Sequence, residues 1–382
     1  MERSPRGFTL FVTIGLEFTA VLVLTSLLIW LFNPVAHRIG WLDRPAGRKD
    51  HGTPTPYHGG LAMYVALVVV VLTLVNPHPP MRALMLASGL LVLVGLLDDM
   101  FDVRWYLRIL AQVFAALILV YVGGVQIAQI GPVFGLQPMS LGVLSVPFTV
   151  FATVGLINAL NMSDGVDGLA GMLSLAALLM LAAAAYYAGN ERLVHGLVMI
   201  SAAVTAFLVF NLRRPGQRRA KVFMGNAGSA FLGLVIAWAA FRLTQNPGHP
   251  VSPVLAPFLI APPVIDCLVL MLRRLVNGRS PFSADRGHMH HYMVDAGFSV
   301  TTAVFVITAF SLLLGGVAAL ALKADLPYPL FVVAFLSMTV GWYWLTARRE
   351  RAVRALHALH EGLVALPVLG RVIPALEQPR SS

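Results

Sequence analysis

Long apolar segments alternate with short polar stretches along nearly the whole chain. The segments cover residues 8–33, 59–76, 81–97, 107–124, 143–160, 168–188, 193–211, 227–243, 254–272, 301–322 and 327–347. A membrane-spanning helix needs about 20 mostly apolar residues, whereas the strands of a membrane barrel are shorter and alternate in polarity. The pattern predicts an all-α integral membrane protein with about eleven transmembrane helices. These form a polytopic domain over residues 1–347, followed by a basic tail at 348–382.

Composition supports the same class of protein. Hydrophobic residues make up 58% of the 382 residues, and charged residues only 12%. A soluble protein carries about 25% charged residues. The one cysteine, Cys267, excludes a disulfide within the chain.

The formal charge of +10 is explained by orientation in a membrane. Of the 27 Lys and Arg residues, 21 lie in the stretches 34–58, 98–108, 161–167, 212–226 and 273–300 and in the tail from 348. Because cytoplasmic loops collect Lys and Arg, these stretches are predicted to be cytoplasmic. The N-terminus is then periplasmic and the C-terminus cytoplasmic, and the charge requires no nucleic-acid partner.

Four polar clusters fall on this predicted cytoplasmic face. They read "LLDDMFDVR", "NMSDGVDGLA", "KVFMGNAGS" and "SADRGHMHH". No comparable cluster occurs in the stretches predicted to lie outside. Clusters from separate parts of the chain that share one face of the membrane are what an active site requires.

The first cluster brings Asp98, Asp99 and Asp102 together at a helix end, because residues three or four apart are neighbours on a helix. Unpaired carboxylates this close repel each other. A divalent cation removes the conflict, and hard oxygen ligands favour Mg²⁺ or Mn²⁺. A solvated helix end with ordinary surface charges is the alternative.

The remaining clusters offer groups that suit phosphate. Asn158, Asn161, Asp164 and Asp167 lie within ten residues, and a helix cap explains only one of them. The turn around Gly225 opens a helix and offers backbone amides to an anion. The "DRGHMHH" stretch favours phosphate contact over zinc, because no partner Cys or His has suitable spacing. Asp266, inside an apolar segment, is expected to face the bundle interior, where it orients the Arg273–Arg274 region or reaches the site.

In order and spacing these motifs resemble the polyprenyl-phosphate N-acetylhexosamine-1-phosphate transferases, over residues 8 to 347. The motifs are "GLLDDMFD", "NALNMSDGVDGL", "KVFMGNAGS" and "SPFSADRGHMHH". The resemblance implies a phosphoglycosyl transferase that uses UDP-N-acetylglucosamine and undecaprenyl phosphate and gives UMP and undecaprenyl-pyrophosphoryl-N-acetylglucosamine. The site is expected at the cytoplasmic face of the bacterial inner membrane, the product is expected to start O-antigen or related lipopolysaccharide and cell-envelope glycans, and a homodimer is compatible with the family.

The resemblance also implies roles for residues of this sequence. The catalytic candidates are Asp98, Asp99, Asp164 and Asp167, with Asp98 as the base toward the lipid phosphate. The substrate-binding candidates are Lys49, Asn158, Asn161, Phe223, Arg286, His288, His290 and His291. Among these, Phe223 matches an aromatic that stacks on uracil, the histidines match a pyrophosphate motif, and Lys49 matches a basic residue of the nucleotide pocket. The metal candidates for Mg²⁺ or Mn²⁺ are Asp98, Asp99 and Asn226.

Asn226 departs from the family pattern, which has Asp at this position. An Asn keeps a carbonyl oxygen but loses the charge, so Mg²⁺ is expected to bind less tightly. Either Asp98 and Asp99 compensate or the chain is an inactive variant. Transfer of another UDP-N-acetyl sugar stays open as an alternative. A transporter is disfavoured, because the acidic residues gather at one face whereas transporter sites lie near the midplane.

Overall fold

The computed structural model describes residues 5–43, 54–135, 137–246, 248, 251–281 and 286–365, with side chains from residue 13 onward. Its membrane-length helices are α1 (Pro5–Ile39), α3 (Pro79–Phe101), α5 (Ser145–Ser163), α6 (Leu169–Tyr187), α7 (Glu191–Asn211), α8 (Gly225–Thr244), α12 (Val300–Lys323) and α13 (Tyr328–Thr346). Two shorter apolar helices are α2 (Gly59–Leu74) and α4 (Trp105–Tyr121). The short elements are η1 (Gly142–Leu144), η2 (Pro253–Leu255), α9 (Ala256–Leu259) and α11 (Met289–Asp295). The remaining helices are α10 (Ala261–Val276) and α14 (Arg349–Val364).

Every predicted apolar segment is helical, which confirms a multi-pass, essentially all-α membrane protein. Among the described residues, eight helices are long and apolar enough to cross a membrane, and a bent pair would make nine. The shorter α2 and α4 have 16 and 17 residues. In the part of the chain that the structure describes, the one β-sheet is a two-residue antiparallel pairing of β1 (Leu42–Asp43) with β2 (Thr55–Pro56).

The ninth predicted segment is not one straight helix. The piece Pro253–Leu259 and helix α10 meet at an angle of 82° around Ile260. Pro262 and Pro263 follow directly, at the start of α10. Proline lacks an amide hydrogen and favours the first turn of a helix, so the chain starts a new helix here.

Helix α8 forms the centre of the bundle. In its most apolar stretch 89% of the residues are buried, and α2, α3, α5 and α6 pack around it. Glycines allow the close approach: a Cβ on Gly95 of α3 would collide with the Ala227 backbone, and one on Gly233 would lie 2.6 Å from the Ile157 Cα. Small residues at helix contacts are the usual means of tight packing in membranes. As a result the ends of α3 and α5 meet the beginning of α8.

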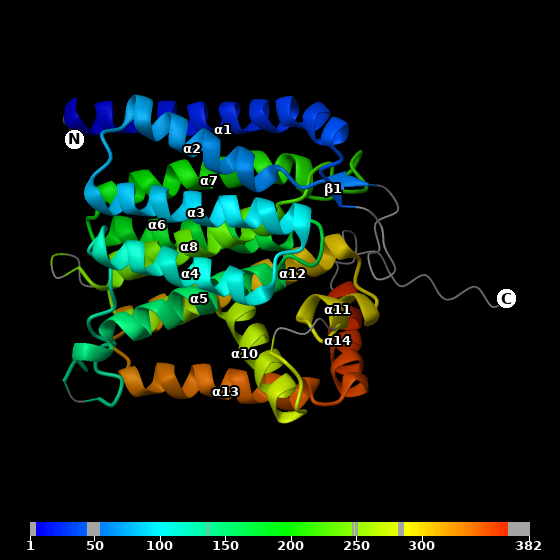
Figure 1. The fold of residues 1–382 in the computed structure, drawn as a ribbon. Helices are drawn as coiled ribbons and strands as arrows, with labels where there is room; N and C mark the ends of the chain where they lie inside the picture. The colour runs from blue at the N-terminus through cyan, green and yellow to red at the C-terminus, as the bar shows by residue number, and fades with distance from the viewer. Residues whose placement is uncertain are drawn as a thin grey trace.

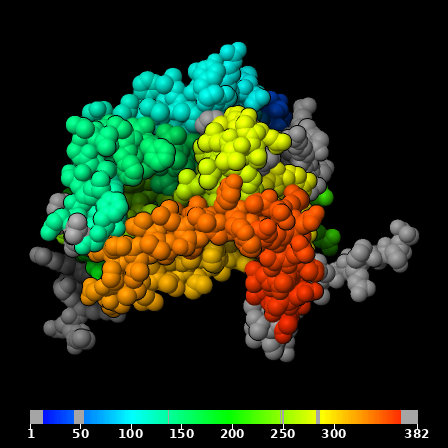
Figure 2. All heavy atoms as spheres, turned by 90° about the horizontal axis from the view of Figure 1, so that it is seen from below, coloured from blue at the N-terminus to red at the C-terminus, as the bar shows by residue number. Residues whose placement is uncertain are grey.

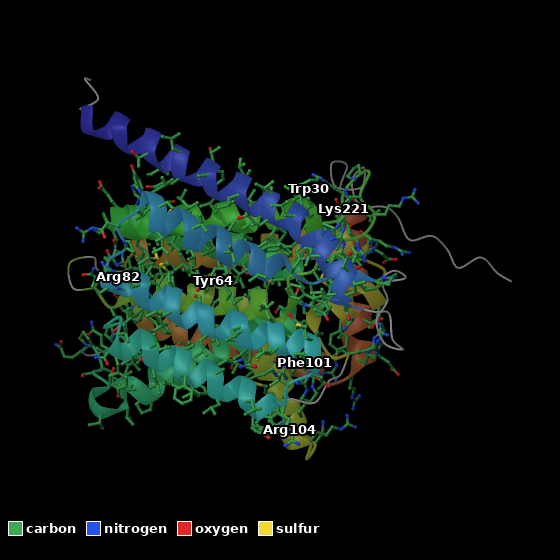
Figure 3. All side chains as sticks on the ribbon, turned by 45° about the horizontal axis from the view of Figure 1, so that its top comes forward. Trp30, Tyr64, Arg82, Phe101, Arg104 and Lys221 are labelled. Carbon is green, nitrogen blue, oxygen red and sulfur yellow. The ribbon has the colours of Figure 1, made fainter. Side chains whose placement is uncertain are left out.

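The polar clusters share one end of the bundle, called the site end here. Figure 1 shows α11, α14 and β1 at this end, where α3 and α5 finish and α8 begins. In Figure 3, Phe101, Arg104 and Lys221 lie toward this end, whereas Arg82 lies at the opposite, far end. The prediction that the clusters share one face is therefore confirmed.

Helix α14 lies within the stretch that the sequence predicted only as a basic tail. It packs on α11 through an ion pair between Arg349 and Asp295 and through His357 Nδ1, 3.1 Å from the Ala296 carbonyl oxygen. Figure 2 shows α14 in red beside the end of α13, in orange. The described part of this stretch is thus a docked helix that supports α11.

Candidate active site

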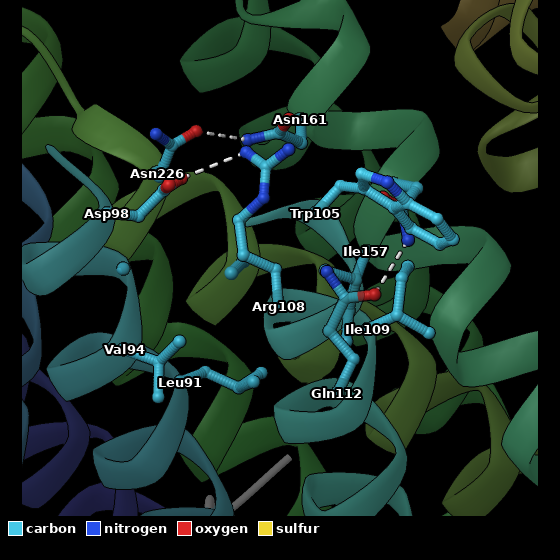
Figure 4. A pocket seen from close by; sticks show the side chains of 13 residues that line it. Leu91, Val94, Asp98, Trp105, Arg108, Ile109, Gln112, Ile157, Asn161 and Asn226 are labelled. Atoms are coloured by element: carbon cyan, nitrogen blue, oxygen red, sulfur yellow. Dashed lines mark hydrogen bonds and ion pairs between the residues drawn. The ribbon is translucent and has the colours of Figure 1, made fainter. Parts of the chain in front are cut away.

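A pocket lies between α3, α4, α5 and α8 near the site end, and Figure 4 shows its lining. It holds about 480 Å³ of space that opens to the outside. Its polar lining residues are Asp98, Arg108, Gln112, Asn158, Asn161 and Asn226. Its apolar lining includes Leu91, Val94, Ile109, Ile157 and Ala230. The pocket is therefore amphipathic, with its charged groups close to the end of α3.

Asp98 and Arg108 form an ion pair in this pocket. Arg108 Nη1 donates to Asp98 Oδ2 over 2.9 Å, and the Asp98 side chain is only 2% exposed, whereas that of Arg108 is 37% exposed. Figure 4 shows the Arg108 side chain reaching from α4 toward Asp98. A buried carboxylate needs such a partner. The sequence alone gives no sign of this pairing, because an Arg in a cytoplasmic stretch is already accounted for by membrane orientation.

Asp99 turns away from the pocket toward the start of α8. Its Oδ1 accepts a hydrogen bond from the Asn226 amide over 3.0 Å, and Tyr57 donates its hydroxyl to the Asp99 carbonyl oxygen over 2.6 Å. Asp99 Oδ2 is buried and has no hydrogen-bond partner among the described residues. Gly225, with φ +71°, leaves the room that this carboxylate occupies, because a Cβ there would collide with Oδ2. The two neighbouring carboxylates therefore face different sides: Asp98 faces Arg108 in the pocket, and Asp99 faces the start of α8.

Side-chain amides connect the helices around the pocket. Asn161 Nδ2 donates to Asn226 Oδ1 and to Ser229 Oγ, each over 2.9 Å. Asn158 Nδ2 donates to Gln112 Oε1 over 2.7 Å. The structure therefore brings Asn158, Asn161 and Asn226 together with Asp98, as the sequence predicted.

Asp167 holds the loop that precedes α8. Its Oδ2 accepts hydrogen bonds from Arg213 Nε over 2.7 Å and from the Ala220 amide over 3.1 Å. Next to it, the residue Asp164 is exposed at the surface. Asp167 is thus tied into the fold, and Asp164 faces the solvent-accessible side of the site.

The histidine motif is fixed to the bundle by Asp266. The Asp266 carboxylate lies 3.1 Å from His288 Nδ1, and it accepts hydrogen bonds from the Met289 amide and from Trp342 Nε1, each over 3.1 Å. The sequence placed Asp266 in the bundle interior but did not identify these partners. Asp266 therefore joins α10, α11 and α13 and orients His288.

His290 brings α11 against the loop that follows α5. A Cβ on Gly165 would collide with the His290 ring, so this glycine permits the contact. Burial, followed by the neighbouring His291 and His288, lowers the pKa of His290 well below its usual value. Burial likewise lowers the pKa of His291. The three rings lie together, with centroids 5.4 Å apart for His288 and His290 and 4.3 Å apart for His290 and His291.

The other predicted residues lie around this core or outside the described chain. Phe223 is partly exposed, and its backbone accepts from the Gly59 amide over 3.1 Å and donates to Pro56 over 2.8 Å. Arg286 is exposed just before α11. Lys49 lies outside the described residues. Within the described ranges, no group of three or more His, Cys, Asp and Glu side chains is arranged to hold a metal, so Asn226 would have to complete any ligand set.

Known proteins are similar in sequence to this chain over most of its length. The profile of glycosyl transferase family 4 matches residues 81–244, from the first turn of α3 to the end of α8. An undecaprenyl-phosphate alpha-N-acetylglucosaminyl 1-phosphate transferase of Escherichia coli O157:H7 is 34% identical over 350 residues, covering 90% of this chain and 95% of that protein. The protein of the same name from Yersinia pestis is 33% identical over 361 residues, covering 91% and 99%. That from Escherichia coli K12 is 35% identical over 310 residues, covering 81% and 84%.

Proposed function

This chain belongs to glycosyl transferase family 4, and we propose on that premise that it transfers N-acetylglucosamine 1-phosphate from UDP-N-acetylglucosamine to undecaprenyl phosphate. The products are undecaprenyl-pyrophosphoryl-N-acetylglucosamine and UMP. The observation that carries the proposal is the Asp98–Arg108 pair at the polar part of a pocket whose other walls are apolar.

The pocket suits the lipid substrate. Leu91 lies seven residues before Asp98 on α3, about 10 Å along the helix, so the apolar wall extends from the ion pair into the bundle. A lipid phosphate placed at Arg108 would gain a charge-assisted contact. The first isoprene units would then lie beside Leu91, Val94 and Ile109.

The nucleotide sugar suits the solvent-accessible side of the same site. Arg286 is exposed there, and the rings of His288 and His291 lie against that of His290, which contacts Gly165 in the loop that carries Asp164. We assign the pyrophosphate to Arg286 and the histidines, because Arg and His donate charge-assisted hydrogen bonds to phosphate oxygens. The partly exposed Phe223 is the aromatic that we assign to uracil, with Lys49 in the same nucleotide pocket.

The reaction joins two anionic phosphates. An oxygen of the lipid phosphate attacks the phosphorus that carries the sugar, and the bond between this phosphorus and the bridging oxygen of UMP breaks. Asp98 accepts the proton if the attacking phosphate carries one. Arg108 and Arg286 lower the repulsion between the substrates, and together with the N–H groups of the histidines they stabilise the charge of the transition state.

The residues present fit a Mg²⁺ or Mn²⁺ ion. Asp99 Oδ2 is buried without a hydrogen-bond partner among the described residues, and such oxygens normally have a donor or an ion. Asp99 would hold the ion through Oδ2, and Asp98 and Asn226 would join it by releasing their contacts to Arg108 and Asn161. When bound, it would neutralise phosphate charge.

We place the site end in the cytoplasm of a bacterium, at the inner membrane. The support is the distribution of Lys and Arg, 21 of which lie in the stretches assigned to this end. The lipid then enters from the bilayer and the nucleotide from the cytoplasm. On this assignment, the product starts a surface glycan such as O-antigen.

The test is a turnover assay on the purified full-length chain. We expect UMP release from UDP-N-acetylglucosamine that requires undecaprenyl phosphate and a divalent cation, and slower release from other UDP-N-acetyl sugars. The Asp98→Asn variant serves as the inactive control. UMP release that ignores the lipid, or a clear preference for another sugar, would contradict the proposal.

A further inference from the structure

Helix α14 lies across the site end of the bundle. Figures 1 and 2 show it running at right angles to α13 and to the long helices of the bundle. Those helices cross the membrane, so α14 runs along the plane of the membrane. Its residues Val353, Leu356 and Leu363 pack on the apolar cluster that contains Met293 and Phe298. One side of α14 is therefore covered by the protein.

The other side of α14 carries three arginines at three-residue intervals, called the arginine face here. Arg348 and Arg354 are exposed, and Arg351 is partly exposed. Residues three apart are neighbours on a helix, so the three side chains leave it within an arc of about 120°. Within the described ranges none of the three forms an ion pair, and Arg354 Nε donates to the Glu350 carbonyl oxygen over 3.3 Å rather than to its carboxylate. The arginine face is thus a group of cations without an anionic partner in the described protein.

Trp344 fixes the level of this face relative to the membrane. It lies in the last turn of α13 and is 62% exposed. In the most apolar stretch of α13 only 11% of the residues are buried, so this helix faces lipid. A tryptophan at the end of such a span lies at the level of the lipid head groups.

Arg351 is held on this tryptophan. Its guanidinium carbon lies 4.0 Å from the centroid of the Trp344 ring, and its Nη1 donates to the Trp344 carbonyl oxygen over 2.8 Å. A cation over the face of an indole ring is stabilised by the charge distribution of the ring. The middle cation of the arginine face therefore lies at head-group level, with Arg348 and Arg354 on either side of it along α14.

Orientation in the membrane does not explain this arrangement by itself. The distribution of Lys and Arg between the two sides of a membrane requires only that basic residues lie on the cytoplasmic side. It does not require three arginines on one side of one helix, or a stacking contact that holds one of them on a lipid-facing tryptophan. The arrangement fits a flat anionic surface that begins at the level of Trp344.

We propose that the arginine face of α14 binds the phosphate groups of anionic phospholipids in the adjoining leaflet, which is the cytoplasmic leaflet in the orientation proposed above. Guanidinium groups donate charge-assisted hydrogen bonds to phosphate oxygens, and anionic lipids attract basic residues that lie close to the membrane. Helix α14 is then held on one side by the apolar cluster and on the other by lipid head groups.

The test is hydrogen–deuterium exchange, followed by mass spectrometry, on the full-length protein in nanodiscs. Nanodiscs of phosphatidylcholine alone are compared with nanodiscs that also contain phosphatidylglycerol. The amides of α14 are expected to exchange about fivefold more slowly with phosphatidylglycerol, the contribution of one basic residue near an anionic lipid surface. High salt should reduce the difference, because it screens exposed charges.

Two triple variants separate charge from other effects of substitution. Replacement of Arg348, Arg351 and Arg354 by Gln should remove the difference between the two kinds of nanodisc, whereas replacement of all three by Lys should keep it. Arg104→Gln is the matched control, because Arg104 is an exposed cation at the site end but precedes α4. This control should keep the full difference.

Three results would overturn the proposal. The first is equal exchange of α14 in both kinds of nanodisc in the unmodified protein. The second is a phosphatidylglycerol effect that persists in the triple Gln variant. The third is equal slowing by inorganic phosphate added to phosphatidylcholine nanodiscs, which would show a plain anion site instead of a lipid surface.

Discussion

Asp266 offers the sharpest test of how the site is organised. Its carboxylate accepts from three donors on two elements: His288 Nδ1 and the Met289 amide at the start of α11, and Trp342 Nε1 on α13. The Met289 and Trp342 bonds go to Oδ1, and the His288 contact goes to Oδ2. Asp266→Asn can keep one oxygen for the first two bonds, and it replaces the other by an amide nitrogen. The change therefore removes the His288 contact selectively.

The size of the effect follows from this one contact. A hydrogen bond to a charged group contributes about 1.5–3 kcal/mol. If that energy holds His288 in its reactive orientation, turnover with UDP-N-acetylglucosamine should fall by about 10- to 100-fold. Asp266 contacts no substrate in the proposed arrangement, so it acts as a positioning residue through His288. The assay is steady-state UMP release, with kcat and KM measured separately.

Two comparisons separate positioning from simple loss of structure. Trp342→Phe removes a donor to the same carboxylate without touching His288, and it should change turnover less than threefold. In a double-mutant cycle, Asp266→Asn combined with His288→Asn should be no slower than His288→Asn alone, because coupled residues are non-additive. Equal losses in Asp266→Asn and Trp342→Phe, or additive losses in the cycle, would refute the reasoning.

Three further predictions follow from the same structure. Asp98→Asn should abolish transfer while the protein still inserts in the membrane, and wild-type turnover in the purified variant would exclude Asp98 as the base. Asn226→Asp should lower the Mg²⁺ concentration needed for half-maximal turnover, and identical metal titrations would show that residue 226 is not a ligand. A reporter fused after residue 360 should read cytoplasmic and one near residue 248 should read external, and the opposite labelling would overturn the assigned orientation.

The helices were predictable because their signal is local. Twenty apolar residues in a row dictate a membrane helix wherever they occur. The break at Ile260 was not predicted, although the prolines at the start of α10 account for it. Helix α14 was missed because it is amphipathic and charged, so neither its hydropathy nor its position in a basic tail distinguished it.

The sequence was enough to predict which residues gather at the site, but it did not predict which of them contact one another. Charge distribution alone was enough to bring Asp98, Asn161 and Asn226 to one end of the bundle. The Asp98–Arg108 pair depends on how α3 and α4 pack after a short turn, and ten residues of separation carry no such information. In the same way, Asp266 and His288 are 22 residues apart, and only the fold shows that the buried acid holds the histidine.

At residue 226 the hydrogen-bonding geometry is the same for Asn and Asp, whereas the charge differs. Asn226 Oδ1 accepts from Asn161, a bond that an Asp oxygen would accept equally well, so the arrangement of α5 against α8 does not depend on which residue is present. The charge does change. Residue 226 lies in the first turn of α8, where the helix dipole is positive, and Asp98 and Asp99 already place two carboxylates beside it. With Asn, Arg108 and the helix end balance two negative charges rather than three, so the site keeps its shape while its attraction for a cation falls. This combination favours an active enzyme with a raised metal requirement over an inactivated one.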